Sequence, residues 1–145
     1  MKELTIIVPI YTEVDGIDML ESEFLRYFDK SALNPQVLLL DDGSTDGSLA
    51  KIKKLCQSNL KFHYISFDRN RGLSAAMLAG FKYANSEWVG YIDADLQTKP
   101  IDFLSFEPFM NTFDLILESR MGRKDSEVKK LISRFANWFR DSIAS

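Results

Sequence analysis

The sequence predicts an α/β fold, a three-layer sandwich in which a mostly parallel central sheet is covered by helices on both faces. Short apolar runs typical of strands alternate with amphipathic stretches typical of helices along a chain of 145 residues. Such alternation implies crossover connections, which join parallel strands. The chain is 46% hydrophobic, enough for one packed core, so we expect residues 1–145 to form a single domain.

The first half of the chain supplies the opening elements of this sheet. The run at 4–9 is continuously apolar, which is typical of a strand buried on both faces. An amphipathic helix is expected at about 16–28, and Asn34-Pro35 breaks it. A second strand at 37–40 runs into an acidic loop that contains glycine, and another helix is expected from Ser48 to about Gln57.

The second half continues the same alternation of strands and helices. The third helix carries an apolar stripe from Leu73 to Ala84, in which the small residue Gly80 indicates close packing on the sheet. The expected elements are, in order, a strand at 62–67, the helix at 73–84, a strand at about 88–92, a helical segment at 101–110 that Pro108 interrupts, a strand at 114–118 and a basic amphipathic helix at about 125–143.

Composition excludes several classes of protein. A formal net charge of -3 gives no global attraction to nucleic acid or to an anionic membrane. The single cysteine, Cys56, cannot form an internal disulfide, and no zinc-ligand spacing occurs. No signal peptide or membrane-spanning run is present. We therefore expect a cytoplasmic protein that associates with a membrane at most peripherally.

The stretch from Trp88 to Asp95 is an apolar run that ends in two carboxylates. Side chains of an extended segment alternate faces, so Asp93 and Asp95 are expected to point the same way. Two adjacent carboxylates repel each other unless a cation neutralises them, and a hard divalent metal such as Mg²⁺ or Mn²⁺ suits their oxygens. The alternative is that Asp-Ala-Asp only ends a strand and starts a turn.

The loops at the carboxyl edge of the expected sheet lack the common phosphate-binding motifs. Neither G-x-x-x-x-G-K-[ST] nor G-x-G-x-x-G occurs, which argues against a phosphate-loop NTPase and a dinucleotide-dependent dehydrogenase. Ligands of open parallel sheets bind at this edge. Its side chains are acidic, so a bound phosphate requires an intervening cation, or some carboxylates bind a base or ribose instead. They are Glu13, Asp41, Asp42, Asp93 and Asp95.

Four motifs in series carry a family resemblance. They are VPIYTE, LLLDDGSTDGS, NRGLSAAMLAGFKYA and YIDADLQTKP. In this order and spacing they resemble the family 2 glycosyltransferases, and most closely the polyprenyl-phosphate branch that includes dolichol-phosphate mannosyltransferase. The resemblance extends from about Leu4 to at least Arg134 and implies a fold of the GT-A type, which binds nucleotide sugars.

The resemblance also implies roles for residues on the donor side. Pro9, Tyr11 and Glu13 would line the base and ribose side of a nucleotide-sugar pocket, and Asp42 would accept hydrogen bonds from the base. Asp93 and Asp95 match the acid-x-acid metal motif, and Gln97 would help hold the metal and diphosphate. Alternatives remain for two features. Tyr11 suits a half-buried aromatic at a strand end, and the loop after residue 40 can cap a helix through Ser44 or Asp46.

The basic C-terminal stretch resembles the acceptor side of the same branch. Arg120 matches the serine-arginine pair of the family, which implies a catalytic role. With Lys129, Ser133 and Arg134 of the stretch KKLISRFANWF, it would bind the acceptor phosphate. A solvated basic helix face is the competing interpretation. Trp138 and Phe139 suit either a membrane surface or the core.

The implied function is inverting, metal-dependent transfer of a sugar from a nucleoside diphosphate sugar to a polyprenyl phosphate, in the synthesis of cell-envelope glycans. Family members continue beyond this length, so we expect a truncated chain whose donor half is complete and whose acceptor half is not. One alternative is a catalytically silent nucleotide-sugar-binding domain. Another is an enzyme that elongates a polysaccharide, which would need a general base for the sugar hydroxyl.

Four further residues have simpler interpretations. Arg69 and Arg71 can offset diphosphate charge, but cations beside a helix start are usually solvated. His63 lies within an expected strand away from the acidic edge, and Cys56 lies on a helix face, so both are interpreted as structural.

Overall fold

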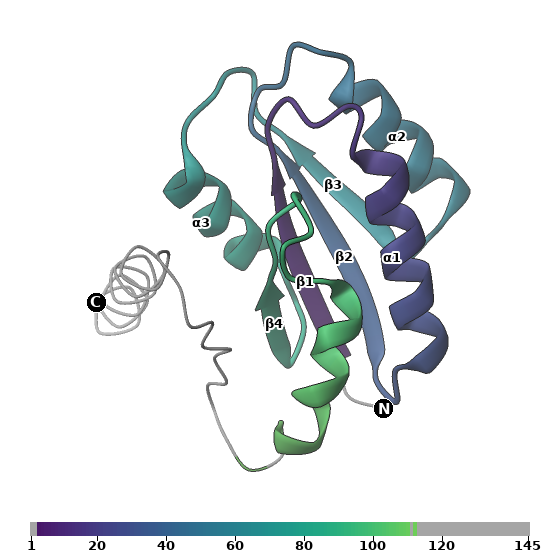
Figure 1. The fold of residues 1–145 in the computed structure, drawn as a ribbon. Coiled ribbons are helices and arrows are strands. Elements are labelled where there is room, and N and C mark those ends of the chain that lie inside the picture. The colour runs from purple at the N-terminus through teal and green to yellow at the C-terminus, as the bar shows by residue number, and fades with distance from the viewer. Residues whose placement is uncertain (1–2, 111, 113–145) are drawn as a thin grey trace, which may run out of the picture. The chain divides into compact units, whose positions relative to one another are not determined.

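The computed structural model describes residues 3–110 and 112. The chain divides into two compact units, Met1–Asn111 and Thr112–Ser145, and every element below belongs to the first. The elements, in order, are β1 (Glu3–Ile10), α1 (Ile17–Lys30), β2 (Asn34–Asp41), α2 (Ser48–Ser58), β3 (Phe62–Ser66), α3 (Leu73–Tyr83), β4 (Trp88–Tyr91), and two short 3₁₀ helices, η1 (Pro100–Ser105) and η2 (Glu107–Phe109) (Figure 1).

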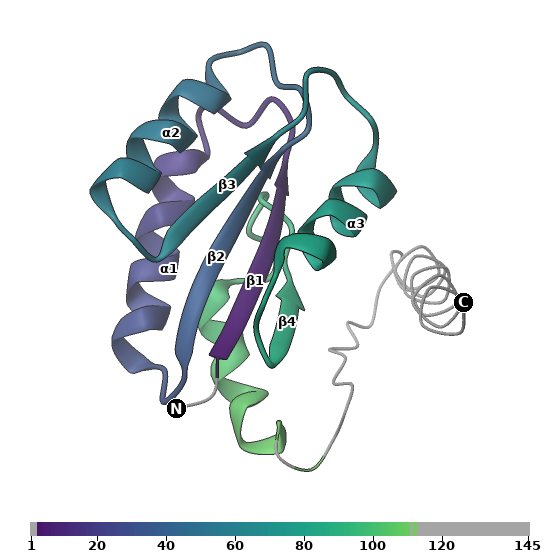
Figure 2. The same ribbon diagram turned by 180° about the vertical axis from the view of Figure 1, so that it is seen from behind.

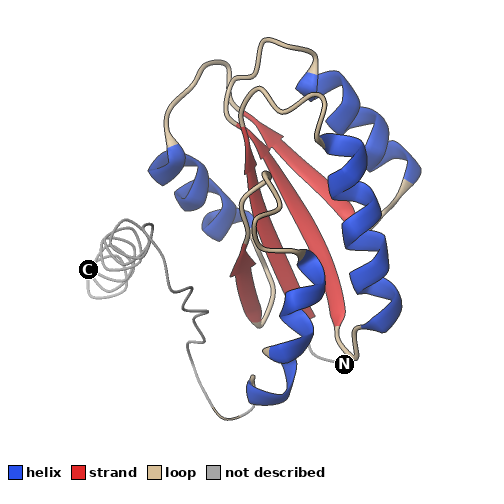
Figure 3. Ribbon diagram, in the orientation of Figure 1, coloured by secondary structure: helices blue, strands red, loops and turns tan. Residues whose placement is uncertain are grey.

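The four strands form one sheet in the order β3-β2-β1-β4, and each neighbouring pair is parallel. Helices α1 and α2, together with η1, lie on one face of the sheet, and α3 lies on the other (Figures 1 and 2). The alternation of strands and helices along the chain, seen by type in Figure 3, therefore produces the expected three-layer α/β sandwich. The fold-class prediction is confirmed.

The central strands β1 and β2 are buried on both faces, as their continuous apolar runs predict. Strand β2 is longer than expected because Pro35 lies inside it rather than only breaking the helix before it. The N–H of Val37 points toward β3 and donates to the Lys61 carbonyl at 2.8 Å, so Pro35, two residues earlier, faces the same side. Pairing with β3 begins only at Val37, and the missing proline N–H therefore costs no ladder bond.

The face under α3 has its own apolar core. Ile7 and Leu38 pack against Ala76 and Met77 of the helix. A Cβ built on Gly80 would lie 2.7 Å from Ile7 Cδ1, which confirms that this glycine permits close packing of the helix on the sheet. Leu73, expected at the start of the buried stripe, is instead 41% exposed.

The opposite face is sealed by aromatic rings of α1 and the 3₁₀ helices. The Tyr27 ring packs against Phe103 at 6.0 Å between centroids, and its hydroxyl donates to Glu107 at 2.7 Å. The helical segment expected at 101–110 is present as η1 and η2. The break between them falls at Phe106, whereas Pro108, the expected point of interruption, lies inside η2. The strand expected at 114–118 and the basic helix expected at 125–143 lie outside the described residues.

Candidate functional site

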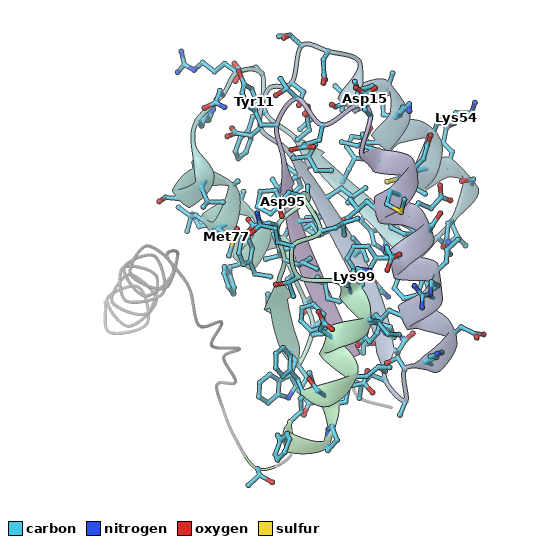
Figure 4. All side chains as sticks on the ribbon, in the orientation of Figure 1. Tyr11, Asp15, Lys54, Met77, Asp95 and Lys99 are labelled. Carbon is cyan, nitrogen blue, oxygen red and sulfur yellow. The ribbon has the colours of Figure 1, made fainter. Side chains whose placement is uncertain are left out.

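The strand order reverses at β1, since the chain builds β2 and β3 on one side of it and then β4 on the other. Ligands of open α/β sheets bind beyond the carboxyl ends of the strands at such a switch point. A pocket of about 320 Å³ lies there. Six residues expected at the donor site line it: Pro9, Tyr11, Glu13, Asp42, Asp93 and Asp95. Tyr11 and Asp95 are marked in Figure 4, on the loops that follow β1 and β4.

The loop after β1 is fixed to the loop that leads into α2. The Thr12 N–H donates to Ser44 Oγ at 3.0 Å, and the Glu13 N–H donates to Ser48 Oγ at 3.1 Å. Thr12 has a positive φ of 51°, a conformation that these bonds help to hold. The neighbouring Tyr11 ring is 48% exposed, so the loop holds it at the pocket rather than in the core.

Asp46 and Ser44, expected as capping residues, differ in what they do. The Asp46 carboxylate accepts the N–H of Ser48 at 3.0 Å and the N–H of Val14 at 3.2 Å, and bonding from the Ser48 hydroxyl lowers the pKa of this carboxyl. Ser44 instead accepts the N–H of Thr12. The N-cap position of α2 is Gly47, with a φ of 94°. Asp46 is therefore not the N-cap residue, although its carboxylate accepts the N–H of Ser48, the first residue of the helix.

Asp42 is buried, at 5% exposure, and holds the loop that leads into α3. Its two carboxylate oxygens accept the N–H of Arg71 at 2.7 Å and the N–H of Gly72 at 3.1 Å. Asp41, its neighbour, binds the Ser44 N–H and the Ser66 hydroxyl. Both carboxylates therefore organise loops around the pocket, although Asp42 also lines it.

Gly43 makes the approach of these two loops possible. Its φ is +73°, and a Cβ built on it would lie 2.3 Å from the carbonyl carbon of Arg69. No side chain fits at that distance. The loop after β3 is thus packed directly onto the backbone of the loop after β2.

Asp93 and Asp95 share the pocket for a different reason from the one expected. Strand β4 ends at Tyr91, and the chain turns between Asp93 and Leu96, whose N–H approaches the Asp93 carbonyl at 3.4 Å. Alternation along a strand therefore does not extend to Asp95. The Asp95 carboxylate accepts the backbone N–H of Gln97 at 3.1 Å, which forms an Asx-type turn. Asp-Ala-Asp therefore does start a turn, and both of its carboxylates also line the pocket.

Tyr91, which had no assigned role, contacts the acidic pair directly. Its hydroxyl donates to Asp93 Oδ1. Burial of the ring raises the pKa of the Tyr91 phenol well above its usual range, and the hydrogen bond and the negative charges of Asp93 and Asp95 raise it further. The phenol is therefore a neutral hydrogen-bond donor.

The donor set at this turn suits a hard divalent cation. Asp93 and Asp95 are exposed and offer carboxylate oxygens, which Mg²⁺ and Mn²⁺ prefer. In residues 3–110 and 112, no cluster of three or more His, Cys, Asp or Glu side chains could hold a metal alone. The pair would supply part of a coordination shell, and water and phosphate oxygens would supply the rest, as is usual for Mg²⁺.

Several other predicted residues lie in less direct positions. Gln97 is exposed and is not among the described residues that line the pocket. The Arg71 guanidinium binds Asp68 at 3.0 Å and stacks over the Phe67 ring at 5.4 Å, so it faces its own loop. Arg120, Lys129 and Ser133, expected at the acceptor side, lie outside the described residues.

His63 and Cys56 both line a second hollow of about 280 Å³ at β3, formed by residues of α2, β3 and the end of α3. Burial raises the pKa of the Cys56 thiol to about 11, which makes it a poor nucleophile at neutral pH. The raised pKa of the thiol agrees with the structural interpretation of Cys56.

Sequence reasoning missed five residues that line the main pocket: Ile10, Asn70, Gly72, Leu73 and Ala94. Leu73 was assigned to the core because it fits the helical apolar period, yet as the first residue of α3 it faces the pocket. Its position directly after a polar loop at the ligand-binding edge was the available signal. Asn70 offered the same signal within that loop.

A parallel sheet in this order, with helices on both faces, is the arrangement of GT-A glycosyltransferases. TarS of S. aureus, solved as residues 1–349 in complex with UDP-GlcNAc, aligns with a TM-score of 0.63 at 25% identity, over 77% of this chain and 31% of the solved TarS chain. The mannosyltransferase PcManGT from Pyrobaculum calidifontis, solved with GDP-Man and Mn²⁺, aligns with a TM-score of 0.56 at 24% identity, over 63% of this chain and 27% of that one.

The chain belongs to glycosyl transferase family 2, whose model matches residues 5–141. CsbB of Bacillus subtilis, which carries a glycosyltransferase name, is 32% identical over 131 residues, 90% of this chain and 40% of CsbB. The undecaprenyl-phosphate 4-deoxy-4-formamido-L-arabinose transferase of Aeromonas hydrophila is 32% identical over 139 residues, 94% of this chain and 43% of the relative. The predicted resemblance to family 2 and its polyprenyl-phosphate branch is confirmed, and the chain spans about two fifths of the length of these relatives.

Proposed function

We propose that this chain is the donor-binding part of an inverting, metal-dependent glycosyltransferase that uses a nucleoside diphosphate sugar. The observation that carries the proposal is the convergence, in one pocket at the switch point, of an exposed tyrosine, a buried aspartate and an acid-x-acid turn. They come from the loops after β1, β2 and β4, which meet only because the strands are parallel and β4 joins the sheet beside β1.

The base and ribose would bind on the side of β1 and β2. The Tyr11 ring is exposed at the pocket and offers a face for stacking on a base. Each Asp42 oxygen already accepts one backbone N–H, and a carboxylate oxygen has capacity for a second donor, such as a ring N–H of the base. Pro9 and Glu13 complete this side of the pocket.

The diphosphate would bind on the side of β4. Asp93 and Asp95 would hold Mg²⁺ or Mn²⁺, and Gln97 would assist from the same turn. The cation, when bound, would stabilise the negative charge that develops on the leaving diphosphate. The two carboxylates would hold the cation, and the short Ala94 between them, which also lines the pocket, would leave room for the phosphates.

The acceptor is proposed to be a polyprenyl phosphate, as in the names of the relatives. A lipid phosphate is already an anion, so its attack on the anomeric carbon needs no strong general base. Arg120, Lys129 and Ser133 are the proposed phosphate-binding residues. This acceptor would place the protein at the cytoplasmic face of a membrane as a peripheral protein. No helix in the described ranges is long and apolar enough to cross one.

The donor site is tested by calorimetric titration of UDP and GDP into the chain, with Mn²⁺ and with EDTA. We expect Asp95→Ala to abolish the Mn²⁺-dependent part of nucleotide binding because half of the carboxylate pair is lost. Asp15→Ala is the matched control, since Asp15 is an exposed acid at the same edge that does not line the pocket. Equal affinities in the two variants would contradict the proposed metal site.

The acceptor is tested by transfer from UDP-GlcNAc or GDP-Man, the two donors found in the structural neighbours. With undecaprenyl phosphate present, labelled sugar should enter the organic phase as a lipid-linked product, and the anomeric configuration of that product should be inverted. Transfer to a sugar hydroxyl in place of the lipid would reject the proposed acceptor.

A further inference from the structure

Tyr91 is the last residue of β4, and its hydroxyl donates to Oδ1 of Asp93. Residues two apart on an extended segment lie on the same face, which explains why the phenol reaches this carboxylate. Asp93 itself is exposed, so it has little packing of its own to fix its side chain. In the part of the chain that is described, Tyr91 is the side chain that contacts it through a hydrogen bond.

The Tyr91 ring is held from behind. It packs against the apolar core under α3, the cluster that includes Ile7 and Met77, and Tyr91 pairs in register with Ile7. An aromatic side chain has only two rotatable bonds, so packing of the ring also fixes the hydroxyl. A rigid donor anchored in the core therefore reaches a carboxylate that stands on an exposed turn.

We propose that Tyr91 is a positioning residue of the donor site, which holds Asp93 through Oδ1 and leaves Oδ2 for the divalent cation. The inference rests on the proposed function, because it requires a cation at Asp93. Groups that orient metal ligands in this way raise metal affinity, and their removal typically weakens binding by about 10- to 100-fold.

The same hydrogen bond could serve only to stabilise the end of β4, and metal affinity separates the two roles. A merely structural bond would change the unfolding temperature and leave the affinity of the folded protein for Mn²⁺ unchanged. A positioning bond would change Mn²⁺ affinity and leave nucleotide binding in EDTA unchanged.

The test uses Tyr91→Phe in the full chain, which keeps the ring and removes only the hydroxyl. The matched control is Tyr27→Phe, because Tyr27 also donates a phenol hydrogen bond to a carboxylate, that of Glu107, on the opposite face of the sheet. Mn²⁺ is titrated by calorimetry in the presence of saturating UDP or GDP, whichever binds the wild type. Circular dichroism verifies that each variant is folded at the titration temperature.

We expect Tyr91→Phe to raise the Kd for Mn²⁺ by about tenfold, with the nucleotide Kd in EDTA unchanged, and Tyr27→Phe to leave both unchanged. A Tyr91→Phe variant with wild-type Mn²⁺ affinity would overturn the positioning role, and the proposed function would survive if Asp95→Ala still lost metal-dependent binding. A wild type without Mn²⁺-dependent nucleotide binding would overturn both.

Discussion

Replacing Asp42 by alanine tests how the structure holds the pocket together. The substitution removes the acceptor of two backbone N–H groups, those of Arg71 and Gly72, at a side chain that is 5% exposed. Hydrogen bonds to a charged group contribute roughly 1.5–3 kcal/mol each, and water entering the open pocket recovers part of that, so we expect a loss of about 3 kcal/mol in the free energy of unfolding. Urea denaturation followed by circular dichroism measures it.

The same variant has a local readout in the loop that Asp42 holds. Arg69 and Arg71 are trypsin sites, and the packing of this loop on Gly43 shields its backbone. Trypsin under native conditions should therefore cut Asp42→Ala faster after these arginines, because the loop is no longer tied to the end of β2. Asp42→Asn keeps one acceptor oxygen and should lose roughly half as much stability.

Asp68→Ala is the control for the Asp42 experiment, since it removes an acid from the same loop that forms only an exposed ion pair with Arg71. A surface pair of this kind contributes less than about 1 kcal/mol. If Asp42→Ala destabilised the protein no more than Asp68→Ala, and trypsin cut both at the same rate, the proposed clamp would be refuted.

Two glycine substitutions, at Gly43 and Gly80, test close contacts in the same structure, and a third, at Gly72, is a control. Gly43→Ala should lower the free energy of unfolding by more than about 3 kcal/mol, because its Cβ would lie 2.3 Å from the Arg69 backbone at a φ of +73°. Gly72→Ala is the control: it has open space around it and should show only a backbone cost of roughly 1–3 kcal/mol. Equal losses of stability in urea would contradict the contact at Gly43. Gly80→Ala should lower the free energy of unfolding, measured in urea, by about 1 kcal/mol, the net of overpacking on Ile7 and a gain in helix propensity. Ile7→Val should offset part of that loss in the double variant. Strict additivity of the two substitutions would contradict direct contact.

Much of the fold could be predicted because hydrophobic periodicity reports the same physics that forms the core. The continuous apolar runs of β1 and β2 indicated burial on both faces, and the amphipathic stretches indicated helices that cover them. Pro35 was interpreted only as a helix breaker. Local sequence does not reveal that β2 pairs with β3 only from Val37 onward, two residues after Pro35. Pairing register is a tertiary property.

The candidate site was predicted by residue type and position but not by hydrogen bonding. That Asp42 lies at the ligand edge follows from its place after a strand. Its bonds to the N–H groups of Arg71 and Gly72 join positions about 30 apart in sequence, and no local pattern encodes them. Tyr91 is a different case: no role was predicted for it, although its spacing of two from Asp93 is visible in the sequence and is consistent with a shared face.

The hydrogen bonds divide the pocket into two parts that should respond differently to ligand. The loops after β1, β2 and β3 bind one another, through Thr12 with Ser44 and through Asp42 with the amides of Arg71 and Gly72. The carboxylates of the turn after β4 bind within their own segment, Asp93 to Tyr91 and Asp95 to Gln97.

Binding costs least where the protein is already ordered, so the base side should retain measurable nucleotide affinity in EDTA. A cation that contacts both carboxylates of the turn after β4 and the diphosphate would link this turn to the base side through the ligand. Metal dependence should therefore appear mainly as added affinity for diphosphates over the corresponding nucleosides.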